Sequence, residues 1–512
     1  MPMSTPFKRL ISALLAAGLL LHPSLGVAQT SKPLPRLGDD TSLSYAQEQL
    51  IGQGVVMQLM RSPQLETDAF LQDHVMGMWK RLREGAVKQG LLSIEQEKFF
   101  TWDVFLLRDQ ELNAFALPGG YMGLNLGLMA TVDNESELAA VMAHELSHVT
   151  QRHIARMFTK NERDMPLVLG AILLGVLIAG QSSQGAQALI TGGQAAGVAS
   201  QLSFSRDMER EADRLGLMVH SAAGYEAKGF VGMFRQLSLA SRLYDSQSYP
   251  YLRSHPLTTA READIMARVQ QMDSAPEPLQ SLNFAMVRAR SQVLLLPAGE
   301  LDRIIQLNEA IKAGMPAAQL AASAYAKAFA LLRKGQPDAA LGAWQALDAL
   351  VPLPDQARTW VQSLKAEILL DQRKPSLALE ALGKGPLTRA QRLLKARAQL
   401  VSADAGLLRN AIEDLEFLSA LDPRDAAVWD LVAQAWQSEG HPLRALRAQA
   451  EAHHARYDDR GALDRLRAAL DLGDRLRKQG QLKTEDWQDL EIIQARWRSI
   501  SERLQALLKS RS

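Results

Sequence analysis

The sequence predicts a mainly helical α+β protein, in which a domain with a small sheet is followed by a purely helical region. Three observations lead to this prediction. Short β-rich segments occur only between residues 99 and 128, and stretches with apolar residues at helical spacing surround them. From about residue 280 onward the chain is rich in alanine and leucine and has no strand pattern. The length of 512 residues is enough for two or three domains.

The composition narrows the class of protein. Hydrophobic residues make up 47% of the chain, which is ample for large cores, and 57 basic residues against 56 acidic residues give a net charge of +1. A nucleic-acid surface needs a clustered basic excess, so no nucleic-acid partner is expected. The chain has no cysteine, so disulfides and lipid attachment to cysteine are excluded, and any metal ligand must be His, Asp or Glu.

Residues 1–28 have the pattern of a secretory signal peptide. Lys8 and Arg9 precede a 12-residue apolar run, which is too short to span a bilayer, and a small-x-small cleavage site ends at Ala28. The mature chain is then expected to begin near Gln29 and to lose two positive charges, so that the net charge changes from +1 to −1. An uncleaved anchor is the alternative. The signal resembles a bacterial one, so the expected location is the periplasm.

The first helices and strands are predicted between residues 42 and 128. Two helices are expected up to residue 90, and Thr67 is predicted to cap the second. Their apolar positions are Leu50, Ile51, Val55, Val56 and Leu59, then Phe70, Val75, Met78 and Leu82. The β-rich segment 99–107 predicts a strand, and residues 113–120, with Pro118 and two glycines, predict a tight connection.

Residues 121–128 predict a second short strand, which contains Gly123 and Gly127. Glycines in a strand often allow another backbone to approach closely. We therefore expect an edge strand onto which an extended peptide can add, and an ordinary internal strand is the alternative.

A helix carrying a His-Glu-x-x-His pattern is predicted next. Asn134 can cap it, and Glu137 can complete a capping box. His144 and His148 are four residues apart and therefore share one face, where their imidazoles can bind one zinc ion. Glu145 lies beside that face, where it can accept a proton from a water molecule at the metal.

A second helix is expected to complete the metal site. Glu209 and Asp213 are also four residues apart, so Glu209 can serve as the third ligand while Asp213 accepts the other N–H of a ligating histidine. Gln151 and Ile154 stand where a metzincin would have glycine and histidine, so that class is excluded. His153 is half a turn out of phase with His144 and is expected at the surface or behind the ligands.

Two other features are left with open alternatives. Residues 165–180 are apolar but too short for a transmembrane helix, and a glycine-rich stretch to residue 197 follows them. This segment is either a buried helix or a hairpin that contacts a membrane or an unfolded protein. His255 precedes Pro256 in a predicted loop, where it is solvated, stabilises an oxyanion, or occupies the open metal position and keeps an enzyme latent.

Four motifs in this order resemble the CAAX-prenyl-protease/HtpX-like gluzincin metallopeptidases. They are NAFALPGG at 113–120, NESELAAVMAHELSH at 134–148, FSRDMEREADRLG at 204–216 and SHP at 254–256. The resemblance implies one zinc ion at His144, His148 and Glu209, with Glu145 as base and Asp213 behind a ligand; the match at His255 is weaker. It also implies a membrane-proximal hairpin at 165–197.

The C-terminal half matches the tetratricopeptide pattern. Repeats that start at residues 320, 358, 391 and 425 are 38, 33 and 34 residues apart. Small residues recur where paired helices must approach each other: Ala328, Ala340, Ala366, Ala378, Ala411, Ala433 and Ala445. An α-solenoid is therefore predicted, and a generic helical domain is the alternative.

Together these features predict a signal peptide at 1–28, a zinc metallopeptidase domain at 29–275 and a repeat domain at 280–505. The motifs predict cleavage of proteins or peptides. The resemblance to periplasmic protease-chaperones implies a role with outer-membrane β-barrel proteins and their assembly machinery, with peripheral membrane contact. The competing hypothesis is a non-catalytic, repeat-based chaperone or scaffold with a structural zinc site.

Overall fold

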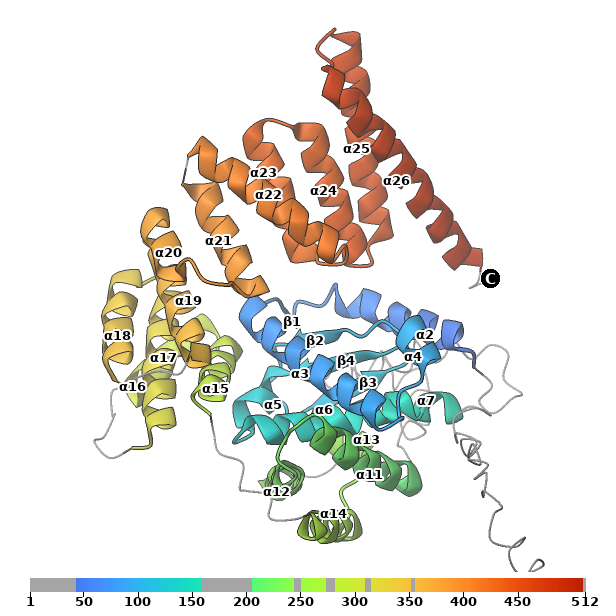
Figure 1. The fold of residues 1–512 in the computed structure, drawn as a ribbon, viewed down its shortest axis with the longest axis vertical. Coiled ribbons are helices and arrows are strands. Elements are labelled where there is room, and N and C mark those ends of the chain that lie inside the picture. The colour runs from blue at the N-terminus through green and yellow to red at the C-terminus, as the bar shows by residue number, and fades with distance from the viewer. Residues whose placement is uncertain are drawn as a thin grey trace, which may run out of the picture. The chain divides into compact units, whose positions relative to one another are not determined.

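The structure is a computed structural model that describes residues 43–157, 205–243, 250–272, 281–308, 315–350, 355–402 and 404–509. The expected signal peptide and the apolar segment 165–197 lie outside these ranges. The described chain contains one four-stranded sheet among many helices, which confirms the predicted mainly helical α+β class (Figure 1).

Two helices open the described chain. Helix α2 (Tyr45–Leu59) begins at Ser44, whose side chain forms a capping box with Gln47. Helix α3 (Ala69–Lys88) is capped by Asp68, which accepts a hydrogen bond from the Leu71 N–H. The prediction that Thr67 caps this helix was wrong by one residue, because the carboxylate of Asp68 reaches the first turn instead. The short helix α4 (Ile94–Phe99) follows.

The sheet has the strand order β1-β2-β4-β3. Its strands are β1 (Leu65–Glu66), β2 (Val104–Leu107), β3 (Ala114–Leu117) and β4 (Tyr121–Asn125). Strand β4 pairs with β2 in parallel and with β3 antiparallel, so β4 is internal and β3 lies at one edge. Three expectations are corrected. The strand expected at 99–107 begins only at residue 104, the expected connection at 113–120 contains β3, and the expected edge strand at 121–128 is an internal strand ending at residue 125.

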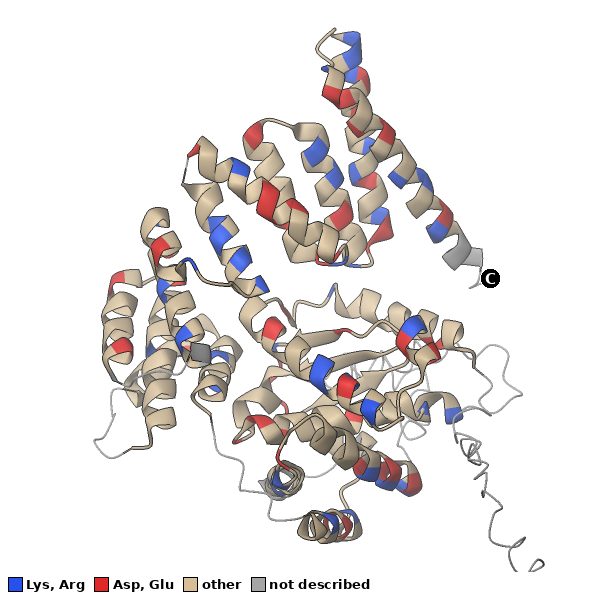
Figure 2. Ribbon diagram, in the orientation of Figure 1, with Lys and Arg blue, Asp and Glu red and all other residues tan. Residues whose placement is uncertain are grey.

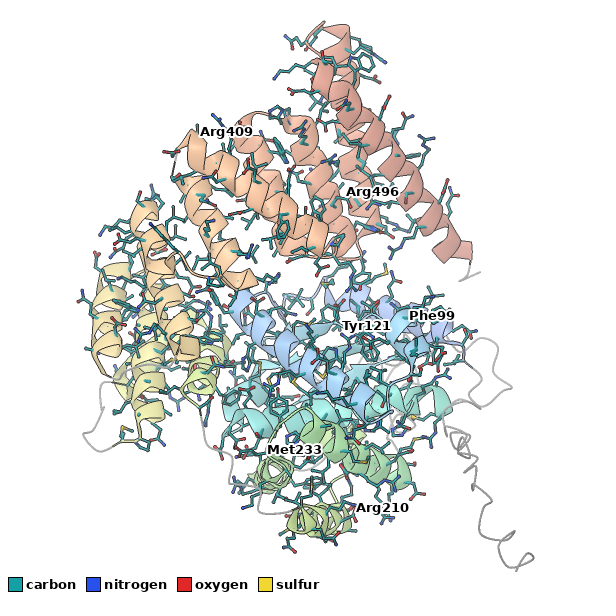
Figure 3. All side chains as sticks on the ribbon, in the orientation of Figure 1. Phe99, Tyr121, Arg210, Met233, Arg409 and Arg496 are labelled. Carbon is teal, nitrogen blue, oxygen red and sulfur yellow. The ribbon has the colours of Figure 1, made fainter. Side chains whose placement is uncertain are left out.

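Alternating side chains of the strands pack into two different cores, as the two-residue period of a strand requires. Val104 and Leu106 of β2 join the core formed with α3, whereas Phe105 and Leu107 pack against α2. Tyr121, labelled in Figure 3, is buried in the second core. The sheet is therefore covered on both faces.

The helices that follow the sheet include those with the predicted metal-binding motifs. They are α5 (Leu126–Thr131), α6 (Glu135–Thr150), α7 (His153–Arg156), α11 (Arg206–Ala222), α12 (Lys228–Leu243), α13 (Pro250–Ser254) and α14 (Thr259–Gln271). Helices α11, α12 and α3 contact α6, and α6 also contacts the edge strand β3. This packing buries α6 from all sides.

The C-terminal half consists of successive helices that pack on their neighbours (Figure 1). They are α15 (Leu282–Leu295), η2 (Ala298–Glu300), α16 (Leu301–Leu307), α17 (Ala317–Arg333), α18 (Pro337–Leu350), α19 (Asp355–Asp371), α20 (Pro375–Leu382), α21 (Arg389–Val401), α22 (Ala405–Leu421), α23 (Ala426–Glu439), α24 (Pro442–Ala455), α25 (Asp459–Lys478) and α26 (Thr484–Lys509). The seven alanines named for the repeat are all buried. Gly335 and Gly440 follow the first helices of two pairs and have positive φ angles of 70° and 83°.

Basic and acidic residues are mixed along these helices (Figure 2). Several of them form ion pairs between neighbouring helices: Arg389 with Asp425, Lys395 with Asp414, Arg444 with Asp489, and Arg496 with Glu451. No helix in the described part of the chain combines the length and apolar character needed to cross a lipid bilayer.

A buried arginine joins the repeat helices to the start of α3. Arg290 of α15 donates hydrogen bonds to Asp68, the cap of α3, at 2.8 Å and to Glu367 of α19 at 2.6 and 2.9 Å. It also donates to the hydroxyl of Tyr325 and lies 4.2 Å from the ring centroid of Phe329. Both acidic partners thus receive a cation away from water, which removes the cost of burying them unpaired.

We predict that Gly123→Ala destabilises the sheet at its edge. A Cβ atom at residue 123 would lie 2.1 Å from Cζ of Phe115, whose ring covers the glycine from the neighbouring strand. The ring must shift, which is expected to lower the free energy of unfolding by about 1–3 kcal/mol. Urea unfolding measures this change.

Gly77→Ala is the matched control. A Cβ atom at residue 77 in α3 meets nothing within 4 Å, so alanine should raise the free energy of unfolding by roughly 0.5–1 kcal/mol. Equal effects of the two substitutions would contradict the packing argument.

Candidate metal centre

Helix α6 carries three of the predicted site residues in a fully buried environment. Asn134 caps the helix by accepting the Glu137 N–H at 2.9 Å, as predicted. The predicted capping box is incomplete, because the Glu137 carboxylate accepts from the backbone of Asp133 instead. His144 and Glu145 have no exposed surface at all. Polar groups in such a place require partners, so their neighbours indicate their role.

Helix α11 supplies those partners by approaching α6 closely. Gly216 marks the contact: a Cβ atom there would lie 3.2 Å from both the Ala143 carbonyl oxygen and the His144 nitrogen. Since no side chain separates the helices at this point, the first turns of α11 bring Glu209 and Asp213 to the histidine face of α6. Both carboxylates are buried.

Four side chains converge on one point: His144, His148, Glu209 and His255, each of which offers one ligand atom within 4.8 Å of all the others. The Nε2 atoms of the two α6 histidines are 3.0 Å apart. The Nδ1 atom of His255 is 3.3 Å from Nε2 of His144 and 2.9 Å from a Glu209 oxygen. The two α6 histidines are each 3.5 Å from an oxygen of Glu209.

This arrangement fits a tetrahedral metal ion. Ligand bonds of about 2.0–2.1 Å at a tetrahedral centre place the ligand atoms roughly 3.3 Å apart, close to the separations measured between these four side chains. Among the described residues, the buried Oε1 atom of Glu145 accepts no hydrogen bond, so it retains an unused acceptor next to this point. Nitrogen and carboxylate donors of this kind suit zinc.

Asp213 lies behind His144, as the sequence predicts for a residue that orients a ligand. Its Oδ1 atom is 3.0 Å from Nδ1 of His144. Burial alone would lower the pKa of His144, but Asp213 and Glu209 outweigh burial and raise it to about 9. Burial would likewise raise the pKa of Asp213, but Arg261 and His144 lower it. The two groups therefore stabilise each other's charged forms in the metal-free chain.

Arg261 of α14 balances both carboxylates. It donates to the two oxygens of Asp213 at 2.6 and 2.8 Å, and its NH1 atom is 2.6 Å from Glu209. The arginine is itself buried. Two buried carboxylates without a compensating cation would be costly, and one shared guanidinium contacts both.

Glu145 is held by the edge of the sheet. Its Oε2 atom accepts the backbone N–H of Ala116 in β3 at 2.9 Å, and its Oε1 atom is 3.5 Å from Nε2 of His255. Burial raises the pKa of this carboxyl, and the neighbouring histidines partly offset that effect. A carboxylate with a raised pKa is a better proton acceptor.

His255 occupies the loop between α13 and α14, as predicted, but it is not solvated. It is buried, and its ring stacks on Tyr251 with ring centroids 4.6 Å apart. Of the two positions expected for His153, the structure has the one behind the ligands: the side chain is buried, with its Nδ1 atom 2.9 Å from Nδ1 of His148. Both histidines therefore contact the predicted ligands directly.

The sequence did not predict three groups that contact the site residues: Arg261, Tyr251 and the Ala116 N–H. Only the arginine could have been expected from the sequence, because two buried carboxylates need a nearby cation. Tyr251 and the backbone donor of Ala116 depend on long-range packing, for which the sequence offers no local pattern.

Comparison with known proteins agrees with this geometry. Residues 83–269 match the model of peptidase family M48. The chain is 30% identical over 449 residues to the beta-barrel assembly-enhancing protease of Escherichia coli K12, covering 87% of this chain and 88% of that protein. It is 31% identical to the protein of the same name from Yersinia pestis, covering 86% and 89%. It is also 28% identical over 177 residues to the mitochondrial metalloendopeptidase OMA1 of Arabidopsis thaliana, covering 34% and 33%.

We predict that Arg261→Leu strongly destabilises the metal-free chain. The substitution leaves the carboxylates of Glu209 and Asp213 buried without their cation, which should lower the free energy of unfolding by about 3–5 kcal/mol. Chemical unfolding in the presence of a chelator measures the loss.

Arg268→Leu, in the same helix, is the control. Arg268 pairs with Asp264 at the surface, and such pairs contribute only about 0–1 kcal/mol. If both variants lose the same small amount, Arg261 does not compensate the buried carboxylates.

Proposed function

This chain belongs to peptidase family M48 and is a metalloendopeptidase, and we propose that its metal is zinc and that its substrates are outer-membrane β-barrel proteins. The observation that carries the zinc proposal is the convergence of four buried nitrogen and oxygen donors within 4.8 Å. Of these, His144, His148 and Glu209 are assigned as the ligands of a single zinc ion. Asp213 is assigned to orient His144.

Zinc supplies Lewis acidity: it polarises the carbonyl of a peptide bond and acidifies water enough for attack near neutral pH. The chain's own contribution to the proton transfers is Glu145. Its carboxylate accepts the proton of the attacking water and later passes it to the leaving amine. The Ala116 N–H fixes one oxygen of Glu145, so the other, Oε1, remains directed toward the point where the ligands converge.

We assign the substrate to the edge of β3. Its neighbour β4 is internal, and an extended peptide can add only to a strand with an unpaired side. Ala116 belongs to this strand and contacts Glu145, so a peptide paired along β3 would pass next to the base. This assignment replaces the segment 121–128 expected from the sequence.

The proposed clients and location follow from the relatives and from the N-terminus. The relatives from Escherichia coli and Yersinia pestis are named for enhancing the assembly of β-barrels, and they align with this chain over more than four fifths of its length. We carry that role to this chain, together with the periplasmic location that residues 1–28 predict. The repeat helices offer a surface for clients or for the assembly machinery, and chaperone activity would accompany cleavage.

His255 is proposed to occupy the fourth ligand position and to keep the enzyme latent. Its Nδ1 atom lies at the same spacing from His144 and Glu209 as the other ligand atoms lie from one another. A fourth protein ligand leaves no place for the water that attacks. The alternative role, stabilising an oxyanion, requires His255 to stand back from the metal.

We predict that Glu145→Gln abolishes cleavage while zinc is retained. Glutamine keeps the size of the side chain but cannot accept a proton, and loss of a general base typically costs about 10²–10⁴-fold in rate. Cleavage of an unfolded outer-membrane β-barrel protein by the purified variant, with zinc measured by atomic absorption, tests both statements.

Two results would contradict this assignment. Cleavage at the unsubstituted rate would show that Glu145 is not the base. If the inactive variant, cross-linked in cells, captured only proteins other than outer-membrane β-barrels, the client proposal would be wrong. A variant that still supports β-barrel assembly without cleavage would indicate separate chaperone activity.

For His255→Ala we predict faster cleavage with zinc still bound. Removing the fourth ligand opens a position for water, while three ligands continue to hold the metal. Cleavage rate and zinc content are measured on the same preparation. Slower cleavage with full zinc content would favour the oxyanion role, and complete loss of zinc would exclude both roles.

A further inference from the structure

The second ring nitrogen of His148 faces another histidine rather than a carboxylate. Nδ1 of His148 lies 2.9 Å from Nδ1 of His153, and the two rings meet edge to face with centroids 4.8 Å apart. Both side chains are buried. This contact differs from that of His144, whose second nitrogen faces the Asp213 carboxylate.

His153 in turn contacts an acidic residue. Its Nε2 atom is 3.1 Å from Oε2 of Glu211, and Arg156 donates to the same oxygen at 2.9 Å. Glu211 lies on α11, two residues after Glu209. Helix α11, which supplies the proposed ligand Glu209, therefore also supplies Glu211. Glu211, His153 and His148 form a series of side-chain contacts that ends at the metal site.

The contacts in this series of side chains determine which nitrogen atoms carry hydrogen. A carboxylate only accepts hydrogen bonds, so Nε2 of His153 carries the proton that points to Glu211. Nδ1 of a neutral His153 is then an acceptor, and Nδ1 of His148 must be the donor. The remaining nitrogen of His148, Nε2, keeps its lone pair, and this is the atom that faces the other ligands.

We propose that His153, oriented by Glu211, is a positioning residue that fixes His148 in the one tautomer able to bind the metal. The inference rests on the proposed metal site and not on the proposed clients. If His153 instead donated from Nδ1, His148 would have to accept there and would carry its proton on the metal side. The two arrangements are mutually exclusive.

A strained backbone places His153 where this role requires it. Five residues after His148 along a regular helix, its side chain would point about 140° away from the metal face. Arg152 interrupts the helix with φ of 53° and ψ of 39°, the left-handed region that non-glycine residues rarely adopt. Its side chain is fixed by Glu48, to which Nε donates at 2.7 Å, and by the ring of Tyr45. The strained backbone of Arg152 thus changes the direction of the polypeptide so that His153 contacts His148.

The first test compares His153→Phe with His153→Asn. Phenylalanine fills the space without an acceptor, whereas the Asn side-chain oxygen can accept from Nδ1 of His148. Loss of an orienting partner typically weakens metal binding about 10- to 100-fold, so the zinc dissociation constant should rise by that factor for Phe and by less than about 10-fold for Asn. Competition with a chelating dye measures zinc affinity, and the visible spectrum of the Co²⁺ form reports the ligand geometry.

His220→Phe is the matched control for loss of a buried histidine. His220 lies on α11 and contacts the backbone carbonyl of Ser136 rather than a metal ligand. This variant is expected to lower stability while leaving the zinc dissociation constant and the Co²⁺ spectrum unchanged. Unfolding of each metal-free variant separates changes in stability from changes in affinity.

A second pair of variants keeps the inference testable if His153→Phe does not fold. Glu211→Ala removes the acceptor for His153, whereas Arg156→Ala removes only the neighbouring cation. We expect roughly 10-fold weaker zinc binding for Glu211→Ala and unchanged binding for Arg156→Ala.

Three outcomes would overturn the inference: unchanged zinc affinity in a folded His153→Phe chain, equal losses for Phe and Asn, or equal losses for Glu211→Ala and Arg156→Ala. If the unsubstituted chain itself binds no zinc, the proposed metal site fails as well. Zinc binding that is insensitive to His153 removes only the positioning role.

Discussion

The close approach of α11 to α6 is the constraint on which the site depends. At Gly216 the two helices are separated by no side chain, and a Cβ atom there would press on the backbone of Ala143 and His144. This contact fixes where the carboxylates of α11 meet the imidazoles of α6. A wider spacing would leave Glu209 unable to share a metal with both histidines, whatever the sequence of either helix.

Because α6 and α11 pack closely, they bury carboxylates whose negative charge must be compensated by a cation from a neighbouring helix. Two carboxylates become buried beside histidines, and each needs a compensating group in the metal-free chain as well as in the loaded one. Arg261 meets this need for Asp213 and Glu209, and it comes from α14, outside both motifs. The metal site is therefore a property of at least three helices and the β3 edge, and not of the His-Glu-x-x-His helix alone.

The sequence predicts the parts of the site that depend on helical periodicity. Residues four apart share a face of a helix, which predicted that His144 lies beside His148 and Glu209 beside Asp213. The alanine- and leucine-rich pattern predicted the helical half. Strand β3 was missed because residues 113–120 were all assigned to a tight connection, whereas the turn occupies only residues 118–120 and β3 pairs with β4 across it as a hairpin. His153 was expected either at the surface or behind the ligands, and the sequence could not decide between them, because no local pattern indicates that the backbone turns at Arg152 in the left-handed region.

The buried Arg290 has a consequence for how the chain unfolds. Asp68 caps α3 and pairs with Arg290 of α15, which follows it by more than two hundred residues. The same arginine also binds Glu367 of α19. One continuous core includes side chains of α3, α15, α17 and α19. A chain cut after residue 275 would thus lose the partner of its own helix cap along with part of its core. The sequence pattern changes near residue 280, but this position does not separate two units that unfold independently. The peptidase helices and the first repeats are expected to unfold in one cooperative transition.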